Sequence, residues 1–356
     1  IMDRYDPSNP SIKWQRQENR NIGFDASLFN NRINLVVNYY NNDTRNLLDD
    51  KKIAASTGRI SVTANVASVN NKGWEISLRT LNIRTDDFSW VTSVNFTKNK
   101  DKVTETYYQD LSEISASTNS TFESLYSLYI QGQPVRAFYG YKFAGVDPYT
   151  GNTLAYVDGF DDDGNRLGTL NAEGKYVYNM DNDLTTQLAN ASRGYLGRSD
   201  PPITGGFTTQ FNYKRFSLFA QFTYMTGHLA RSFQYYSGGT AYASAKNVLK
   251  IEANRWRKPG DMTEIPKYGT SRTEYLYQLF DFRFEKGDYL KCNNISLGYN
   301  LEQSICDKLH ITRARLNFNM ANVFTLTKFR GIDPETKGAF TYPSARSYTF
   351  SLSIGI

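Results

Sequence analysis

Three side chains in the stretch YVDGFDDDGNRLG could bind a metal ion. Asp161, Asp163 and Asn165 have the spacing of the first ligands of a calcium-binding loop. The glycine at the sixth position and the glutamate at the twelfth position of such a loop are both missing. The stretch is therefore either a solvated acidic loop or a loop that Ca²⁺ makes rigid. We prefer the first interpretation and predict no metal site.

Tyrosines in two polar stretches are the other candidates for a binding site. They are Tyr107 and Tyr108 in TETYYQD, and Tyr235, Tyr236 and Tyr242 in FQYYSGGTAYAS. Aromatic rings can pack against sugar faces or peptide side chains. The alternative is that these rings only pack within their own loops. The five tyrosines are weak candidates for substrate binding.

No catalytic constellation occurs in the sequence. The motifs G-x-S-x-G, H-E-x-x-H, C-x-x-C and G-x-x-x-x-G-K-[ST] are all missing. His228 and His310 lie far apart with no cluster of ligands around either, so we interpret both as structural or solvated. Cys292 and Cys306 are the only cysteines and are predicted to be free thiols. We therefore predict neither an enzyme nor a cofactor.

Composition excludes several classes of protein. The chain has 356 residues, and no stretch approaches the roughly 18 to 20 consecutive apolar residues of a membrane-spanning helix. Its net charge of +6 comes from 41 basic and 35 acidic residues that are scattered along the chain. No basic stripe with stacking aromatics occurs, so nucleic-acid binding is not expected. A membrane β-barrel is not excluded, because only every second residue of its strands faces lipid.

Hydrophobicity alternates with a period of two along almost the whole chain, which is typical of β-strands with one apolar and one polar face. The first clear example is INLVVNYY, residues 33–40. Eleven strands are predicted, near 14–29, 33–48, 66–84, 88–103, 135–147, 152–158, 203–213, 216–227, 288–301, 312–327 and 344–356. One short helix could lie within 246–261, and no second domain is expected.

The connections between these strands alternate in length. Short turns are expected at 30–32, 85–87, 147–152 and 214–215. Long polar loops are expected near 50–65, 104–134, 159–202, 228–275 and 329–342. Short turns at one end and long loops at the other are typical of outer-membrane barrels. The sequence therefore predicts an all-β, antiparallel transmembrane barrel.

In such a barrel the two faces of each strand meet different surroundings. We expect Asn34, Asn38, Ser89, Asn95, Asn317 and Asn319 to line the lumen. We expect Ile33, Leu35, Trp90, Phe222 and Phe350 to face lipid. Tyr39 and Tyr40, at the outer end of their strand, suit an aromatic belt at the membrane surface.

Several stretches resemble the SusC/RagA-type TonB-dependent outer-membrane transporters. They are NPSIKWQRQENRNIGFDASLFNNRI (9–33), NKGWEISL (71–78), VRAFYGYKFAGVDPYTGN (135–152), RWRKPGDMTEIPKY (255–268), GDYLKCNNISLGYNL (287–301), ANVFTLTKFRGIDPE (321–335) and YPSARSYTFSLSIGI (342–356). These stretches follow one another over nearly the whole chain, so the resemblance is more specific than any single motif. One departure is the final residue, since such barrels commonly end on an aromatic and this chain ends on Ile356.

The resemblance implies a 22-stranded barrel with a plug in its lumen. Residues 1–356 would be the C-terminal part of that barrel, about half of it, without the plug domain and without a signal peptide. A half barrel leaves two unpaired edges in lipid, so the remaining strands must come from a second polypeptide or from another part of the same one. One hypothesis is two non-covalently paired halves, separated by a break in an extracellular loop.

For function, the resemblance implies TonB-dependent import of an oligosaccharide or oligopeptide across the outer membrane of a Gram-negative, Bacteroidota-like bacterium. Its implied partners are a SusD-like surface lipoprotein, TonB acting through the plug, membrane lipid and a higher-order complex. If Asn30-Asn31 is a periplasmic turn, the chain begins outside the cell and ends in the periplasm. The alternatives are a passive porin-like channel or receptor without a plug, and a soluble β-rich surface adhesin.

Overall fold

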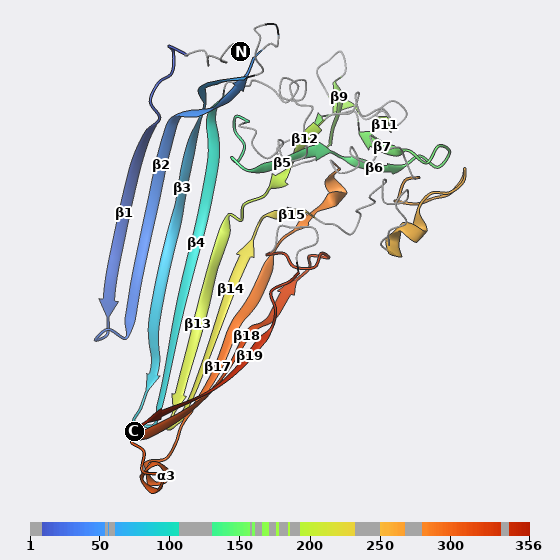
Figure 1. Ribbon diagram of the computed structural model, residues 1–356. Coiled ribbons are helices and arrows are strands. Elements are labelled where there is room, and N and C mark those ends of the chain that lie inside the picture. The colour runs from blue at the N-terminus through green and yellow to red at the C-terminus, as the bar shows by residue number, and fades with distance from the viewer. Residues whose placement is uncertain are drawn as a thin grey trace, which may run out of the picture.

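In the computed structural model, most of the described residues lie in β-strands (Figure 1). The described residues are 9–53, 56, 61–106, 130–156, 159–160, 166–170, 176–177, 184–185, 193–231, 250–267, 280–335 and 342–356.

Nine antiparallel strands form one large sheet. They are β1 (Arg16–Leu28), β2 (Ile33–Lys52), β3 (Ser61–Arg84), β4 (Phe88–Thr106), β13 (Ile203–Tyr213), β14 (Phe216–Thr226), β17 (Tyr289–Asn300), β18 (Arg313–Thr327) and β19 (Ser347–Gly355), paired in this order. Strands that are neighbours in this sheet also follow one another along the chain, except that smaller strands lie between β4 and β13 and between β14 and β17. These nine strands match nine of the eleven predicted strands closely.

The register of the sheet confirms its two faces. Trp90 of β4 lies opposite Phe211 of β13, and their rings stack with centroids 5.4 Å apart. On the other face, Asn95 lies between Ser77 of β3 and Gly206 of β13. Followed from strand to strand, the register puts the apolar residues predicted to face lipid on one face, and the asparagines and serine predicted to face the lumen on the other. We call these the apolar face and the polar face.

Short turns lie at one end of the sheet and long connections at the other (Figure 1). Asn30 and Asn31 join β1 to β2 with φ angles of 56° and 64°, a left-handed conformation that asparagine tolerates well. Between β17 and β18, the turn contains a six-residue helix that was not predicted, α3 (Gln303–Lys308). Cys306 is buried in this helix, and both cysteines are free, as expected.

Residues 135–147 and 152–158 form strands, but the prediction that they belong to the large sheet is wrong. They contain β5 (Ala137–Tyr141), β6 (Phe143–Val146) and β7 (Thr153–Tyr156), which pair in two separate small sheets. The turn at 147–152 therefore lies at the end of the long connections and not among the short turns (Figure 1). The large sheet has nine strands instead of eleven, and because both numbers are odd, β1 still begins at the long-connection end and β19 ends at the other.

The remaining elements are short and belong to the long connections. They are β8 (Gly159–Phe160), β9 (Arg166–Leu170), β10 (Tyr176–Val177), β11 (Leu184–Thr185), β12 (Arg193–Arg198), β15 (Leu229–Arg231), β16 (Phe284–Lys286) and the 3₁₀ helices η5 (Lys250–Asn254) and η6 (Asp281–Arg283). Helix η5 lies within 246–261, where a short helix was expected.

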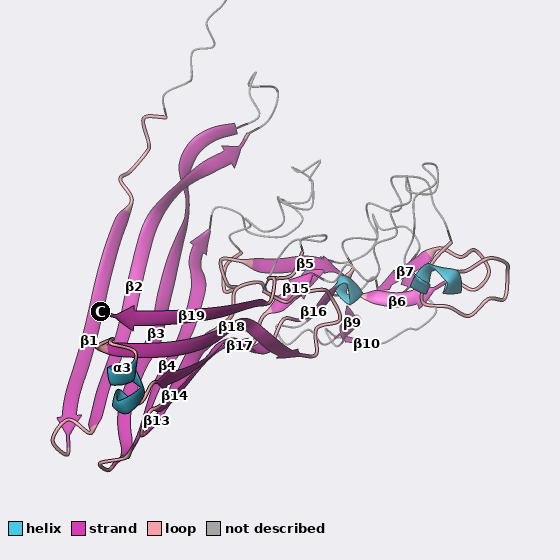
Figure 2. Ribbon diagram, turned by 60° about the horizontal axis from the view of Figure 1, so that its bottom comes forward, coloured by secondary structure: helices cyan, strands magenta, loops and turns pink. Residues whose placement is uncertain are grey.

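The large sheet is open and strongly curved. Strands β1 and β19 form its two edges, each paired on one side only within the described residues. Figure 2 shows that β17, β18 and β19 run across the direction of β1 to β4. No helix in the described part of the chain has the length and hydrophobicity needed to cross a membrane.

Candidate functional site: the polar face and its loop module

The site residues proposed from the sequence are not placed by the structure. Tyr107, Tyr108, Tyr235, Tyr236 and Tyr242 lie outside the described residues, as do Asp161, Asp163 and Asn165. Within the described residues, no group of three or more His, Cys, Asp or Glu side chains could hold a metal ion. The two histidines differ, since His228 is buried while His310 is exposed in the turn after α3.

A cleft of about 420 Å³ lies on the middle of the large sheet. Polar side chains of β2, β3, β4, β13 and β14 line it, among them Asn34, Arg79, Asn95 and Gln221. Gly206 widens the cleft, because a Cβ atom there would lie 3.1 Å from the side-chain oxygen of Asn95 and 2.7 Å from the carbonyl oxygen of Phe222. This surface carries many hydrogen-bonding groups and few charges, which suits a neutral polar ligand or a polar protein surface.

Asp101 fixes the connection between β4 and β13 to the polar face. Its side chain forms an ion pair with Arg198 of β12 and accepts a hydrogen bond of 2.8 Å from the backbone N–H of Val135. The side chains of Asp101 and Arg198 are only 16% and 15% exposed. Backbone hydrogen bonds join Val103 to Gln133 and Gly132. The β4–β13 connection is therefore folded against the long-connection end of β4.

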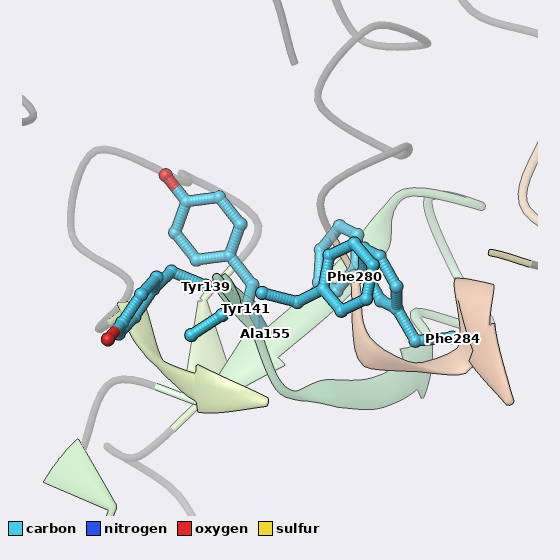
Figure 3. Close-up of a cluster of buried hydrophobic side chains, with 7 residues drawn as sticks. Tyr139, Tyr141, Ala155, Phe280 and Phe284 are labelled. Carbon is cyan, nitrogen blue, oxygen red and sulfur yellow. The ribbon is translucent and has the colours of Figure 1, made fainter. Parts of the chain in front are cut away.

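A buried aromatic cluster joins this connection to the one between β14 and β17. Figure 3 shows Tyr139, Tyr141 and Ala155 together with Phe280 and Phe284. The centroids of the Tyr141 and Phe280 rings are 5.7 Å apart. A further close pair, Phe138 with Phe284, has its centroids 4.5 Å apart. Since aromatic rings bury large apolar areas, this cluster makes one folded unit from two loops that are distant in sequence.

Asp281 strengthens the same junction through polar contacts. Its carboxylate accepts a hydrogen bond of 3.0 Å from the backbone N–H of Phe143 and lies 3.7 Å from the ammonium group of Lys142. Burial raises the pKa of the Asp281 carboxyl, and this effect outweighs the opposing effects of the Phe143 amide and Lys142.

Trp256 holds the turn at 147–152. Its indole Nε1 donates a hydrogen bond of 2.8 Å to the carbonyl oxygen of Pro148, which also accepts one from the backbone N–H of Gly260. The Trp256 ring lies directly against Gly151, whose φ of +70° and close contact leave no space for a side chain. The backbone N–H of Lys267 donates to the carbonyl oxygen of Gly151.

The connection between β18 and β19 is tied to the same region. Lys291 lies on the polar face of β17 and pairs with Glu335, with its own side chain only 6% exposed. Arg330 pairs with Glu285 of β16 at 3.2 Å. The β4–β13, β14–β17 and β18–β19 connections are therefore linked to one another or to the polar face at its long-connection end. We call the described residues 130–156, 193–202, 250–267, 280–286 and 328–335 the loop module.

Some polar atoms near the loop module have no hydrogen-bond partner within the described residues. They include the hydroxyl groups of Tyr139 and Tyr289 and the side-chain oxygen of Asn294, all buried. Tyr289 and Asn294 lie on the polar face beside Lys291. Because buried polar groups are nearly always hydrogen-bonded, these atoms are suited to bind a ligand or water.

Sequence reasoning missed Asp101, Arg198, Asp281, Trp256 and Lys291 as positioning residues. One signal was available, since AFYGY (137–141) is apolar on both strand faces and all five residues are buried. Such a strand belongs to a small core and not to a sheet with a polar face. The ion pairs gave no such signal, because their partners are far apart in sequence.

Three TonB-dependent receptors match nearly all of the chain. TonB-dependent receptor P3 of Formosa agariphila is 26% identical over 98% of the chain, and TonB-dependent receptor P39 of the same organism is 29% identical over 92%. TonB-dependent receptor SusC of Bacteroides thetaiotaomicron is 25% identical over 97%. The solved structure of the RagAB peptide transporter superposes with a TM-score of 0.73, at 26% identity over 98% of the chain.

The chain is homologous to SusC/RagA-type TonB-dependent receptors. A second solved structure, the RagAB peptide importer in its closed-closed state, agrees with a TM-score of 0.72 at 28% identity. No protein-family model matches the chain. The chain spans about a third of the length of these receptors, 35%, 33% and 32% for P3, P39 and SusC. The expected fold class, an all-β part of a transporter barrel, is confirmed.

Proposed function

We propose that the chain forms part of the barrel wall of an outer-membrane, TonB-dependent importer in a Gram-negative bacterium. All of residues 1–356 would belong to this barrel. The apolar face would meet lipid and the polar face would line the lumen. The short-turn end would lie in the periplasm and the long connections outside the cell.

The observation that carries this proposal is the two-faced sheet together with its alternating connections. A soluble sheet protein would cover its apolar face with a second layer, but Phe24, Trp74, Phe216 and Phe350 are all exposed on that face. Phe350, for example, is 80% exposed. Large exposed apolar surfaces mark contact with a membrane or with another protein. The homology to TonB-dependent receptors favours the membrane.

The loop module would form one wall of the substrate chamber above the lumen. Its aromatic core and ion pairs hold three connections in a defined arrangement, which a binding surface requires. A SusD-like surface lipoprotein would bind at this end of the barrel, and the complex would assemble further. The plug domain would fill the lumen against the polar face and transmit the action of TonB.

The substrate would be an oligopeptide or an oligosaccharide. One structural relative is named as a peptide transporter, which supports the first choice. The polar face offers amide and hydroxyl groups that would bind either substrate. The proposal predicts no catalytic activity.

Uptake measurements test the proposal. They use a strain that lacks the transporter and is complemented with the full-length protein that contains this chain. Labelled oligopeptides and labelled oligosaccharides are supplied separately, with and without deletion of TonB. We expect uptake of one class, and its loss when TonB is deleted. Uptake that continues without TonB would show a passive channel.

Co-purification provides a second test. A tagged full-length transporter is extracted from the outer membrane in mild detergent, and its bound proteins are identified by mass spectrometry. We expect a surface lipoprotein at equal stoichiometry. Recovery of the transporter in the soluble fraction without detergent would contradict the membrane location and support a soluble adhesin.

A further inference from the structure

At the long-connection end of β1 to β4, the apolar face ends in a patch of basic side chains. Its last apolar row contains Ile22, Tyr39 and Trp74, with Lys98 as the fourth member. The next row toward the long connections is Arg20, Asn41, Lys72 and Lys100. The row above that ends in Lys102, opposite Asn70. We call Arg20, Lys72, Lys98, Lys100 and Lys102 the basic patch.

The charges of this patch are poorly compensated. Arg20 pairs with Glu18 at 2.6 Å, but none of the four lysines forms an ion pair within the described part of the chain. All four are exposed. Lys72 lies directly opposite Lys100, and like charges in that position destabilise a sheet. An anion bound between them would remove this repulsion.

Two asparagines extend the polar part of the patch beside the lysines. Asn41 lies between Arg20 and Lys72 in the same row. The side-chain amide of Asn70 donates to the oxygens of Asn41, at 2.6 Å, and Asp43, at 2.8 Å. The nearby carboxylates, Glu18 and Asp43, belong to β1 and β2, so the β3–β4 side of the patch remains basic.

The height of the patch fits the surface of a membrane. From Phe88, at the short-turn end of β4, to Lys98 is ten residues. At about 3.4 Å per residue this is roughly 34 Å along the strand, or about 26 Å along the membrane normal at a tilt near 40°. The apolar band of an outer-membrane barrel is about 25 Å tall. Tyr39 and Trp74, with ring centroids 4.9 Å apart, lie where an aromatic belt is expected.

We propose that the basic patch binds the phosphate groups of an anionic lipid headgroup in the outer leaflet, with the lipid's acyl chains against the apolar residues below. Ammonium groups form strong charge-assisted hydrogen bonds with phosphate oxygens. Clusters of lysine and arginine beside a membrane-spanning segment recognise anionic lipids in this way. The inference rests on the proposed membrane location of the apolar face.

Lipid binding to the intact transporter tests this inference. The full-length protein, purified in detergent, is titrated with diphosphorylated lipid A and with its dephosphorylated form, and bound lipid is counted by native mass spectrometry. We expect Lys72→Gln combined with Lys100→Gln to weaken binding of the phosphorylated lipid by about tenfold or more. The matched control, Lys308→Gln combined with Lys328→Gln, removes the same charge from exposed lysines elsewhere and should bind as the wild type does.

Three results would overturn the inference. They are equal binding of the phosphorylated lipid by the patch variant and the wild type, equal binding of both lipids by the wild type, and displacement of the lipid by an equal concentration of inorganic phosphate. If the double variant fails to assemble, the single Lys100→Gln variant is measured, with a smaller expected loss. Membrane fractionation and uptake are measured in the same strains, so a failure of the proposed function would be seen separately, as wild-type protein outside the membrane.

Discussion

Asp101 and Arg198 show how single residues position the loop module. The two side chains are mostly buried, and Asp101 also accepts the Val135 N–H, so both of its oxygens are engaged. Removing one member of a buried pair leaves the other charge desolvated without compensation. A surface pair such as Arg136 with Asp200, separated by 3.8 Å, contributes little because water screens it.

Arg198→Gln should therefore loosen the loop module. We expect a local loss of stability on the order of 3 kcal/mol at residues 130–136, because Asp101 stays buried without its partner. Hydrogen exchange measured by mass spectrometry on the full-length protein checks this, with the strands of the large sheet unchanged. Arg136→Gln is the control and should have almost no effect. Equal exchange in both variants would contradict this role for Asp101.

Asp281 should make the loop module sensitive to pH. Burial raises the pKa of its carboxyl above the unfolded value of about 3.9. A group whose pKa is higher in the folded state contributes stability that is complete below the unfolded pKa and is lost as the pH rises through the folded pKa. Protection of residues 142–143 from hydrogen exchange, corrected for the intrinsic rate, should therefore fall from acidic toward neutral pH.

The Asp281→Asn variant tests the cause of this pH dependence. Its side-chain oxygen can still accept the Phe143 N–H, but it has no proton to lose. We expect a flat profile over the same pH range. Glu302→Gln, at the short-turn end of the sheet, is the control and should keep the wild-type slope. A slope that persists in Asp281→Asn would assign the pH effect to another group.

Among the structural elements, the large sheet depends on keeping its two faces different. Each strand alternates between its bulges, so a substitution acts according to its face. Bulges occur nearer the long connections, between Thr44 and Leu47 and beside Cys292, or close to a short turn, between Leu81 and Ile83. A bulge adds one residue to a strand and changes which face the next side chain occupies.

Leu35→Asp should disturb assembly far more than Asn34→Asp. Leu35 lies on the apolar face, and a carboxylate there would cost about 2 kcal/mol near the middle of a membrane, somewhat less than a lysine or arginine. Asn34 is its neighbour on the polar face and lines the cleft. Heat-modifiable migration of the full-length protein on gels measures assembly. Equal assembly of both variants would favour a soluble protein.

For the whole molecule, the open edges of the sheet are decisive. Among the described residues, strands β1 and β19 each have one edge without a partner strand, and each unpaired backbone group costs several kcal/mol in a lipid environment. The curvature seen in Figure 2 fits a sheet that continues into a larger closed barrel. We propose that further strands pair with both edges.

Expression of residues 1–356 alone should therefore give no heat-modifiable barrel. The same residues expressed with the remaining sequence of the transporter, on one chain or two, should give one. Differential gel migration of boiled and unboiled membrane samples measures this. A stable, heat-modifiable species from residues 1–356 alone would contradict pairing at the edges and indicate closure by self-association.

Strand positions in the large sheet could be read from the sequence because each strand lies between two different surroundings. β13 (Ile203–Tyr213) begins and ends where the alternation predicts. The alternation does not say which strands pair. β5 also reads as a strand, but both of its faces are buried, and its partner is β12, more than fifty residues away.

The sequence by itself determined the all-β class, the residues of each face, the short turns at 30–32, 85–87 and 214–215, and the free cysteines. All of these follow from local patterns, since a period of two and turn-forming residues act within a few residues. Only the tertiary structure decided the number of strands in the sheet, the loop module and the basic patch. These depend on pairs such as Asp101 with Arg198 and Lys72 with Lys100, whose meeting is set by the register between strands and by folding of the long connections.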